Sequence, residues 1–257
     1  MTKFETFRKL HAGNGAFILP NAWDAQSAVI FQESKFPAVA TSSAAVAGSL
    51  GYADGEQMPF AEYLMIVKRI VASVDIPVTV DMEMGYGNTP EEVYSNLQKL
   101  VQAGVVGINI EDSIIQEGTR SLKDAGEFAG MIGFIRNKLA AANEAMFLNI
   151  RCDTFLLKIA DAKSETTRRT KLYESAGADG IFLPLIHDEW DIVSAVGDTH
   201  LPLNVMAMPG IPDMARLSQF GVKRVSMGPF FHSQLYRTAK ELAAEIAAKN
   251  NLQPILQ

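Results

Sequence analysis

The chain has 257 residues, of which 48% are hydrophobic, and this is enough to bury the core of one large globular domain. Its formal net charge of −6 and its pI of 5.3 argue against non-specific binding to nucleic acid or to an anionic membrane surface, because both need clustered Lys and Arg. The single cysteine, Cys152, excludes an intramolecular disulfide and a cysteine-rich zinc site.

The N-terminal stretch MTKFETFRKLHAGNG lacks the apolar core of a signal peptide. No later segment approaches the roughly 20 apolar residues that a membrane span requires. A reducing compartment suits a chain with one thiol. We therefore expect a soluble, cytoplasmic protein, and an enzyme that acts on a small molecule is the commonest protein with these properties.

Eight short, apolar segments rich in β-branched residues alternate along the chain with segments of helical periodicity. In chain order, the predicted strands read AFILPNAW, FPAVATSS, PVTVDME, VVGINIED, AMFLNIRCD, GADGIFLP, LPLNVMAM and GVKRVSMG. Four of them closely follow a helix that ends near Gly or Pro, which is typical of repeating αβ units. The pattern predicts that residues 1–257 form a single α/β domain, a (β/α)8 TIM barrel, with a doubly wound open sheet as the alternative.

The segment NTPEEVYSNLQKLVQAG shows how the sequence marks one of the intervening helices. Asn88 or Thr89 can cap its N-terminus, and Pro90 suits the first turn. Gly104 can close its C-terminal end.

Charged side chains gather on one face of three consecutive predicted strands. Because side chains alternate along a strand, Asp81 and Glu83 share one face of PVTVDMEMGYGN. The same alternation places Glu111 and Arg151 on the inward faces of the next two strands. The active site of such a barrel lies at the C-terminal ends of its strands, so we expect these four residues at one mouth.

Carboxylates that share a buried site are costly to desolvate, so this mouth needs a cation. Mg²⁺ fits, because it binds one or two carboxylates and keeps waters that others can hold, and Mn²⁺ is a substitute. Arg151 would then be free to bind a substrate carboxylate in a bidentate manner.

Several of these residues have simpler interpretations. A pair of acids at a strand end is often a solvated turn or a helix cap, and Ser42 and Ser43 could equally cap a helix or bind an anion there. Cys152 falls on an outward, apolar face, where an inert core thiol is expected. Arg120 and Lys123 lie in the loop after the fourth strand, where contact with substrate is one interpretation and a solvated charge is the more common case. The four histidines show no metal-ligand spacing.

Seven stretches, which together cover most of the chain, resemble the isocitrate lyase and phosphoenolpyruvate mutase superfamily. They read LPNAWDAQSA, ATSSAAVAGSLGYADG, VTVDMEMGYGN, GINIEDS, NIRCDTFL, GADGIFLP and GVKRVSMGP. The resemblance implies a (β/α)8 barrel with an exchanged C-terminal helix, assembly into a homo-oligomer (a dimer or a tetramer), bound Mg²⁺, and a small 2-oxo or enol acid as substrate.

The resemblance also implies a role for individual residues. Asp81 would bind the metal ion directly, and Asp54, Glu83 and Glu111 would hold its water ligands. The residues expected to bind the substrate are Ser42, Ser43, Ala44, Arg151 and Asn204. Those expected to take part in catalysis are Asp54, Arg151 and Ser43.

Members of the superfamily make or break a bond to the carbon beta to a carboxylate through an enolate. Isocitrate and methylisocitrate lyases carry a Lys-Lys/Arg-Cys-Gly-His run in the gating loop after the fourth strand. The corresponding loop here, SIIQEGTRSLKDAGEF, has neither Cys nor His. Phosphoenolpyruvate mutases place a His at the end of the sixth strand, where this chain has Pro184.

We therefore expect a Mg²⁺-dependent lyase or hydrolase that acts on a small, oxaloacetate-like 2-oxo acid through an enolate, by decarboxylation or carbon–carbon cleavage. One alternative is carbon–phosphorus chemistry, as in phosphonopyruvate hydrolase, phosphoenolpyruvate mutase or carboxyphosphonoenolpyruvate phosphonomutase. The other two alternatives are a methylisocitrate lyase and a catalytically quiet protein that binds a 2-oxo acid.

Overall fold

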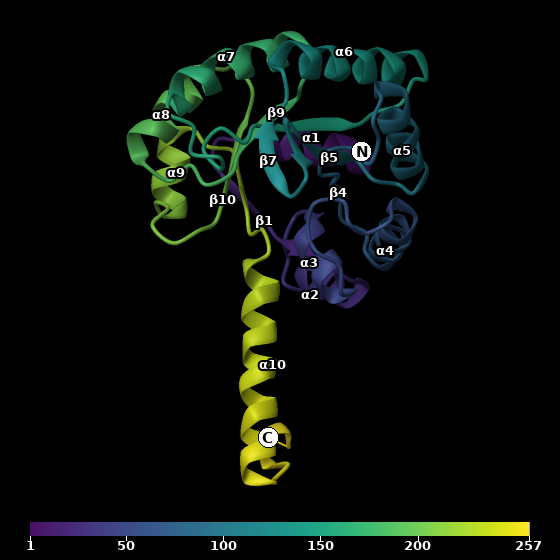
Figure 1. The fold of residues 1–257 in the computed structure, drawn as a ribbon, viewed down its shortest axis with the longest axis vertical. Coiled ribbons are helices and arrows are strands. Elements are labelled where there is room, and N and C mark those ends of the chain that lie inside the picture. The colour runs from purple at the N-terminus through teal and green to yellow at the C-terminus, as the bar shows by residue number, and fades with distance from the viewer. Residues whose placement is uncertain (257) are drawn as a thin grey trace.

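Parallel strands form the centre of the molecule in a computed structural model that describes residues 1–256 (Figure 1). The strands of the main sheet are β1 (Phe17–Leu19), β2 (Asn21–Ala22), β3 (Val39–Thr41), β4 (Val78–Asp81), β5 (Gly107–Glu111), β8 (Phe147–Arg151), β9 (Gly180–Leu183), β10 (Leu203–Met206) and β11 (Arg224–Ser226). Their order is β1-β11-β10-β9-β8-β5-β4-β3-β2, and each neighbouring pair is parallel.

β1 and β2 are the two halves of the first predicted strand, and Pro20 separates them. Proline has no backbone N–H and cannot donate to the strand ladder, although its carbonyl still accepts a hydrogen bond from the Ala40 N–H at 2.8 Å. β1 pairs with β11 and β2 pairs with β3, so the two halves bring the ends of the sheet together. The sheet is a nearly closed barrel, which confirms the predicted TIM-barrel fold and shows that the open-sheet alternative is wrong.

Helices alternate with the strands, and most of them surround the barrel (Figure 1). They are α1 (Lys3–His11), α2 (Ala25–Glu33), α3 (Ser43–Ser49), α4 (Phe60–Ser73), α5 (Pro90–Gln102), α6 (Ala125–Ala141), α7 (Ala162–Ser175), α8 (Glu189–Gly197), α9 (Met214–Phe220), α10 (Phe230–Lys249) and the short 3₁₀ helix η1 (Gln253–Ile255). In α5 the cap is Thr89, whose hydroxyl accepts from the Glu92 N–H at 3.2 Å, and Pro90 is the first helical residue.

The predicted alternation of side chains along the strands is confirmed. Ile108 and Ile150 belong to the main apolar cluster, which also contains Leu97 and Leu100 of α5. Each such side chain contributes about 1.5–3 kcal/mol by its removal from water. The opposite face of each strand points into the barrel, and its polar side chains must therefore find partners there.

The barrel interior is filled in layers, and β8 contributes one residue to each of them. At the N-terminal end, α1 closes the barrel, and His11 stacks on Phe147 with ring centroids 4.3 Å apart. In the middle, the Asn149 side-chain amide donates to the Oδ1 atoms of Asn109 (2.9 Å) and Asn204 (3.2 Å). Arg151 is left at the C-terminal end, where the strands open into the mouth.

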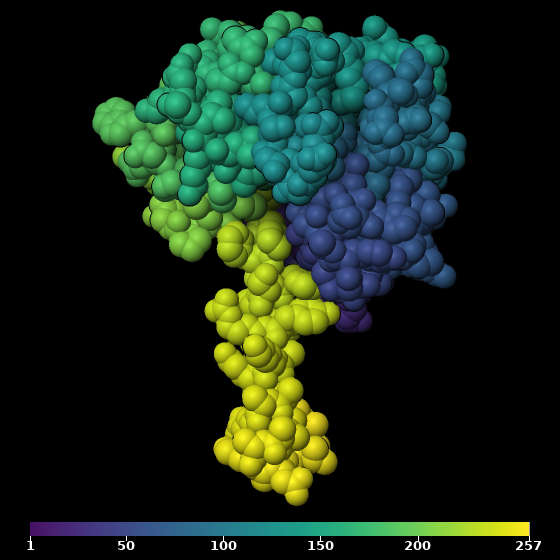
Figure 2. Space-filling model, viewed as in Figure 1, coloured from purple at the N-terminus to yellow at the C-terminus, as the bar shows by residue number. Residues whose placement is uncertain are grey.

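The predicted gating loop is an ordered β-hairpin. Its strands are β6 (Ser113–Gln116) and β7 (Thr119–Leu122), which pair antiparallel. Glu117 and Gly118 form the two-residue turn, and both have positive φ (50° and 75°), as a type I′ hairpin turn requires. The hairpin lies in front of the barrel in Figure 1, and its teal atoms cover the centre of this face in Figure 2.

Helix α10 projects away from the barrel as a long arm (Figures 1 and 2). Its first turns contact α2, where the rings of Phe231 and Phe31 are 5.2 Å apart. None of its residues is buried, and Leu235 and Tyr236 are exposed apolar side chains. Exchange of this helix with a neighbouring subunit stays a prediction, since the structure contains one chain. Among residues 1–256, no helix is both long and apolar enough to cross a membrane.

The aromatic packing around His11 predicts a loss of stability in acid. Burial, and secondarily the charge of Arg224, lowers the pKa of His11 from 6.5 to about 3. Between these values the unfolded chain binds a proton at His11 and the folded chain does not, so this residue makes stability fall as the pH drops below 6.5. The slope is at most about 1.4 kcal/mol per pH unit.

We expect His11→Phe to retain the stacking on Phe147 and to flatten the decline in unfolding free energy between pH 6 and pH 4. Urea unfolding at several pH values measures this decline. His200→Phe, at an exposed position, serves as the control and should follow the wild type. An equal decline in His11→Phe and wild type would contradict the assignment.

Candidate active site at the barrel mouth

Three of the predicted site residues are the last residues of neighbouring strands. Asp81 ends β4, Glu111 ends β5 and Arg151 ends β8. Glu111 and Arg151 are direct partners in the register of their strands. Because parallel strands end at the same edge, the fold brings these three side chains together at the mouth, as the sequence predicts.

The Asp81 carboxylate has one engaged and one unengaged oxygen. Ser43 Oγ donates to Oδ2 at 2.7 Å. Oδ1 is buried and has no hydrogen-bond partner within residues 1–256. Burial raises the pKa of Asp81, while the charge of Arg151 and the Ser43 hydrogen bond oppose this shift. Oδ1 is therefore an acceptor that a cation could satisfy.

Glu83 reaches the mouth region by a different route from the one predicted. β4 ends at Asp81, and Glu83 lies in the following turn with a φ of 48°, so strand alternation does not set its direction and that argument is wrong. Its Oε2 accepts from the backbone N–H groups of Gly55 (2.8 Å) and Glu56 (2.9 Å), and Tyr86 Oη donates to Oε1 at 2.7 Å.

Burial is also the main reason that the pKa of Glu83 rises to about 8, and the nearby charges of Asp81 and Asp54 raise it further. Asp54 itself is exposed and directly precedes Gly55. The Glu83 carboxylate therefore fixes the loop that carries Asp54 beside the mouth.

Arg151 is fully oriented by two carboxylates. Its Nε lies 2.6 Å from Asp153 Oδ1 and its Nη2 lies 3.1 Å from Asp153 Oδ2, while its Nη1 is 2.7 Å from Glu111 Oε2. Burial alone would lower the pKa of Arg151, but Glu111 and Asp153 raise it, so the group stays charged. The expectation that Arg151 is free is wrong. Three of its five N–H groups are engaged, and two remain.

Arg120 lies at the mouth, so the expectation that it is a solvated loop charge is wrong. Its Nη1 pairs with Glu111 Oε1 and donates to Ser113 Oγ at 2.8 Å, and it lies 3.4 Å from Asp153 Oδ2. The signal was present in β7, where Arg120 and Leu122 occupy the less exposed face. Strand alternation would have pointed Arg120 inward if the hairpin had been recognised.

Lys123, at the base of the hairpin, is also turned inward. Its Nζ lies 3.3 Å from the Glu111 carbonyl oxygen, and burial lowers the pKa of this amine. The Lys123 carbonyl accepts from Arg169 Nη2 at 2.9 Å. Arg169 and Tyr173 both donate to the buried Asp112 carboxylate, at 3.1 Å and 2.7 Å. This network anchors the hairpin to α7.

The remaining predicted residues fall into two groups. Ser42 caps α3, and its hydroxyl accepts from the Ala45 N–H at 3.3 Å. The half-buried Ala44 lies in the same helix and directly follows Ser43, the residue that donates to Asp81. Asn204 instead lies in the middle layer of the barrel, where it is 1% exposed and donates to Ser226 Oγ at 3.2 Å. The fold thus brings Ser43 to the mouth and leaves Asn204 beneath it.

The charges at the mouth do not balance. The carboxylates there belong to Asp81, Glu83, Glu111 and Asp153, and the cations are Arg120, Arg151 and Lys123. With every carboxylate ionised, one negative charge is in excess, which is costly in a buried place. A divalent cation bound together with an anionic substrate would compensate it.

The donor set fits Mg²⁺ bound through few protein ligands. Within residues 1–256, no three His, Cys, Asp or Glu side chains are arranged around one metal position. Mg²⁺ does not need such a cluster, because it takes one or two carboxylates and retains water. Asp81 offers an oxygen without a partner in this range of residues. Both oxygens of Glu83 accept from protein donors, while Glu111 Oε2 accepts no hydrogen bond within the same range, although Arg151 Nη1 lies 2.7 Å from it, so both carboxylates have lone pairs left for water.

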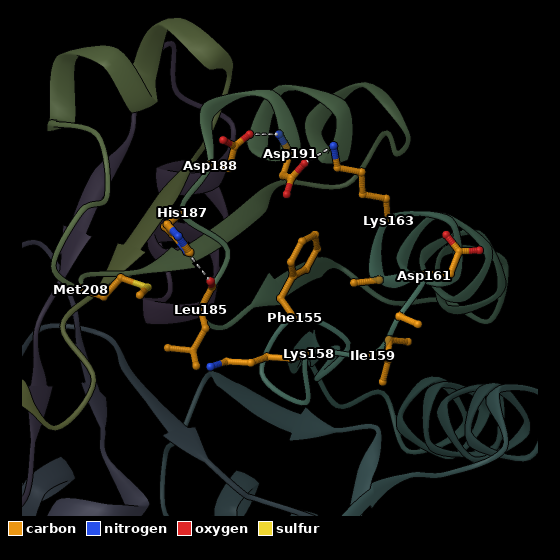
Figure 3. Close-up of a pocket in the computed structure, with 12 residues that line it drawn as sticks. Phe155, Lys158, Ile159, Asp161, Lys163, Leu185, His187, Asp188, Asp191 and Met208 are labelled. Atoms are coloured by element: carbon orange, nitrogen blue, oxygen red, sulfur yellow. Dashed lines mark hydrogen bonds and ion pairs between the residues drawn. The ribbon is translucent and has the colours of Figure 1, made fainter.

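An open cleft of 610 Å³ lies beside the mouth (Figure 3). It is lined by residues that follow β8, β9 and β10, among them Phe155, Lys158, Leu185 and His187. The His187 ring faces the Leu185 carbonyl oxygen, with Nδ1 at 3.0 Å. None of the predicted site residues lines this cleft. The hairpin lies over the mouth through the ion pairs of Arg120 (Figure 2).

Comparisons with known proteins identify relatives of this chain. The family model described as phosphoenolpyruvate phosphomutase matches residues 7–247. The crystal structure of a candidate phosphonomutase from Burkholderia cenocepacia J2315 is 37% identical, with a TM-score of 0.89 over 94% of this chain and 99% of that chain. Oxaloacetate decarboxylase 1 from Pseudomonas fluorescens is 30% identical over 84% of this chain and 75% of its own length. An uncharacterized protein from Mycobacterium tuberculosis is 33% identical over 91% and 86%, respectively.

The unengaged oxygen of Asp81 predicts where a divalent cation binds. Asp81→Asn keeps a group that accepts from Ser43 but removes the charge, and we expect the Kd for Mg²⁺ to rise at least tenfold, which is about 1.4 kcal/mol. Calorimetric titration with Mg²⁺ measures it. Asp75→Asn, an exposed position before β4 at the opposite end of the barrel, is the matched control. Wild-type affinity in Asp81→Asn would refute the site.

Proposed function

Because the chain belongs to the phosphoenolpyruvate phosphomutase family, we propose that it is a Mg²⁺-dependent enzyme that acts on a small, oxaloacetate-like 2-oxo acid through an enolate. Decarboxylation or carbon–carbon cleavage is the proposed reaction. The observation that carries the proposal is the uncompensated charge at the mouth, together with the unengaged Oδ1 of Asp81. The resemblance to the isocitrate lyase and phosphoenolpyruvate mutase superfamily is confirmed.

Asp81 would hold the Mg²⁺ ion directly, with Glu83 and Glu111 reaching its water ligands. When bound, the ion supplies Lewis-acid stabilisation of the negative charge that develops on a substrate oxygen. Ser43 holds the Asp81 carboxylate by its other oxygen and thereby fixes the direction of Oδ1. Asp54, on the loop that Glu83 secures, would hold water at the edge of the same site.

Arg151 would bind a substrate carboxylate or the developing oxyanion with its two remaining N–H groups. Its orientation is fixed before substrate arrives, because Asp153 and Glu111 hold all three of its nitrogens. A donor that does not need to reorganise stabilises a developing charge more effectively than a mobile one. The covering hairpin would exclude water and so strengthen this interaction.

Oxaloacetate decarboxylation is favoured among the reactions because of the hairpin's composition. Residues 113–128 contain neither Cys nor His. Carbon dioxide can leave without prior proton transfer, and solvent can then protonate the enolate. Reactions that need a positioned proton donor would lose the 10² to 10⁴-fold that such groups typically contribute. The relative from P. fluorescens that is named oxaloacetate decarboxylase 1 supports the same choice.

Carbon–phosphorus chemistry on a phosphonate is the second proposed activity. It is supported by the 37% identity with the candidate phosphonomutase from B. cenocepacia. The same mouth would serve, because a phosphonate and a carboxylate both place an anion beside Arg151. Pro184, which follows β9, cannot supply the histidine chemistry that the mutases of this superfamily are expected to use.

A substrate panel tests these proposals. We expect Mg²⁺-dependent turnover of oxaloacetate with a higher kcat/KM than for isocitrate, methylisocitrate or phosphonopyruvate, measured on one enzyme preparation. Turnover of either isocitrate at 10⁴ M⁻¹s⁻¹ or above, which is typical of efficient enzymes, would contradict the argument from the hairpin. Turnover of phosphonopyruvate alone would favour the second proposal.

The fixed fork of Arg151 predicts a specific effect of Arg151→Lys. Lysine keeps the positive charge but lacks the planar guanidinium fork, so it cannot contact Asp153, Glu111 and a ligand at the same time. We expect the inhibition constant of oxalate to rise by an amount equivalent to about 1.5–3 kcal/mol, the range for a hydrogen bond to a charged group. Arg168→Lys, an exposed position on α7 where the arginine pairs with Glu165, should leave the constant unchanged. An unchanged constant in Arg151→Lys would argue against the role.

A further inference from the structure

Arg120 belongs to the hairpin, whereas Arg151 belongs to a strand of the barrel. All hydrogen bonds and ion pairs of Arg120 within residues 1–256 use a single nitrogen, Nη1, which contacts Glu111, Ser113 and Asp153. Its Nε and Nη2 make none. The side chain is 18% exposed, so it is neither locked in the interior nor free in solvent. One edge of the guanidinium group therefore remains available to a ligand.

The two arginines at the mouth differ in this respect. Arg151 has a carboxylate oxygen against each of its three nitrogens. Arg120 has an open Nε/Nη2 edge, and such an edge matches the two oxygens of a carboxylate. A planar, bidentate contact with an incoming carboxylate is thus better prepared at Arg120.

The hairpin is attached at its base and held at the mouth by Arg120. Its base is fixed by Lys123, whose backbone N–H donates to the Asp112 carbonyl at 2.8 Å. Farther along, Ile115 lies against Gly55, where an added Cβ would come within 2.5 Å of Ile115 Cδ1. The hairpin therefore packs on the loop that carries Asp54. Apart from these contacts β7 is largely exposed, and the ion pairs of Arg120 are its charged link to the barrel.

We propose that the open edge of Arg120 binds a carboxylate of the substrate, as a second arginine beside Arg151. This inference rests on the proposed function and deepens it. The substrate class is a 2-oxo acid whose Arg120-bound carboxylate stays in the product. A carboxylate that leaves as carbon dioxide loses its negative charge. A guanidinium group bound to that carboxylate stabilises the charge and would slow the decarboxylation.

The test compares Arg120→Lys with the wild type in the presence of Mg²⁺ and oxalate, a dicarboxylate that serves as the ligand probe. Lysine can still pair with Glu111 and hold the hairpin, but it has no second edge. We expect hydrogen exchange of residues 113–122 in the ligand-free proteins to be the same. Oxalate should slow this exchange in the wild type and much less in Arg120→Lys, with a Kd at least tenfold higher in the variant.

Arg120→Gln removes the charge as well, and we expect faster hairpin exchange even without ligand. Glu117→Gln, at the exposed turn of the same hairpin, should behave as the wild type does. The inference is overturned if oxalate binds Arg120→Lys with wild-type affinity and slows the exchange equally. It is also overturned if oxalate leaves the wild-type hairpin unaffected.

These outcomes are separate from those of the proposed function. Arg120-dependent protection by oxalate, in a protein that turns over no 2-oxo acid, would support the inference and refute the activity. Turnover of oxaloacetate with the same KM in Arg120→Lys and wild type would support the activity and refute the inference.

Discussion

The structure depends on the confinement of four carboxylates beside two guanidinium groups at one end of a barrel. Burial raises the pKa of Asp81 and that of Glu83, because the interior solvates a negative charge poorly. Arg151 and Arg120 compensate Glu111 and Asp153 through direct ion pairs. Asp81 keeps an unengaged oxygen. A buried carboxylate oxygen without a partner indicates a functional site, and the function proposed for this one is to bind a divalent cation together with an anionic substrate.

The rest of the fold keeps these groups in place. The parallel strands end at one edge and deliver Asp81, Glu111 and Arg151 without help from flexible loops. Beneath them, the amide layer around Asn149 and the aromatic packing of Phe147 fill the barrel, so the mouth has a rigid floor. The hairpin is the one part of the mouth that the barrel strands do not supply, and the Asp112 network ties its base to α7.

Much of this arrangement could be predicted from the sequence, because period-two alternation within a strand is a local property. It correctly assigned Ile108 and Ile150 to the core and Glu111 and Arg151 to the interior. It failed for Glu83, which lies just past the strand end, where a positive φ redirects the chain. The predictions for Ser42, Ala44 and Asn204 came from family resemblance, and their roles stay predictions.

The contacts of the hairpin could not be predicted in the same way. In an irregular loop an arginine such as Arg120 is expected to be solvated, and the positive φ of Glu117 and Gly118 is what shows that SIIQEGTRSLKDAGEF forms a hairpin. Whether Arg151 is free or paired depends on where Asp153 and Glu111 point, and such long-range pairing is not encoded in spacing. The ion pairs that decide the chemistry are therefore the part that requires a structure.

The most direct test of this account is a crystal structure of the protein grown with Mn²⁺ in place of Mg²⁺ and measured for anomalous scattering. We predict one strong anomalous peak at the barrel mouth, in direct contact with Asp81 Oδ1, a distance that for Mg²⁺ is roughly 2.0–2.1 Å. Glu83 and Glu111 should lie farther away, with water between. A fully occupied ion elsewhere and none beside Asp81 would contradict the central claim.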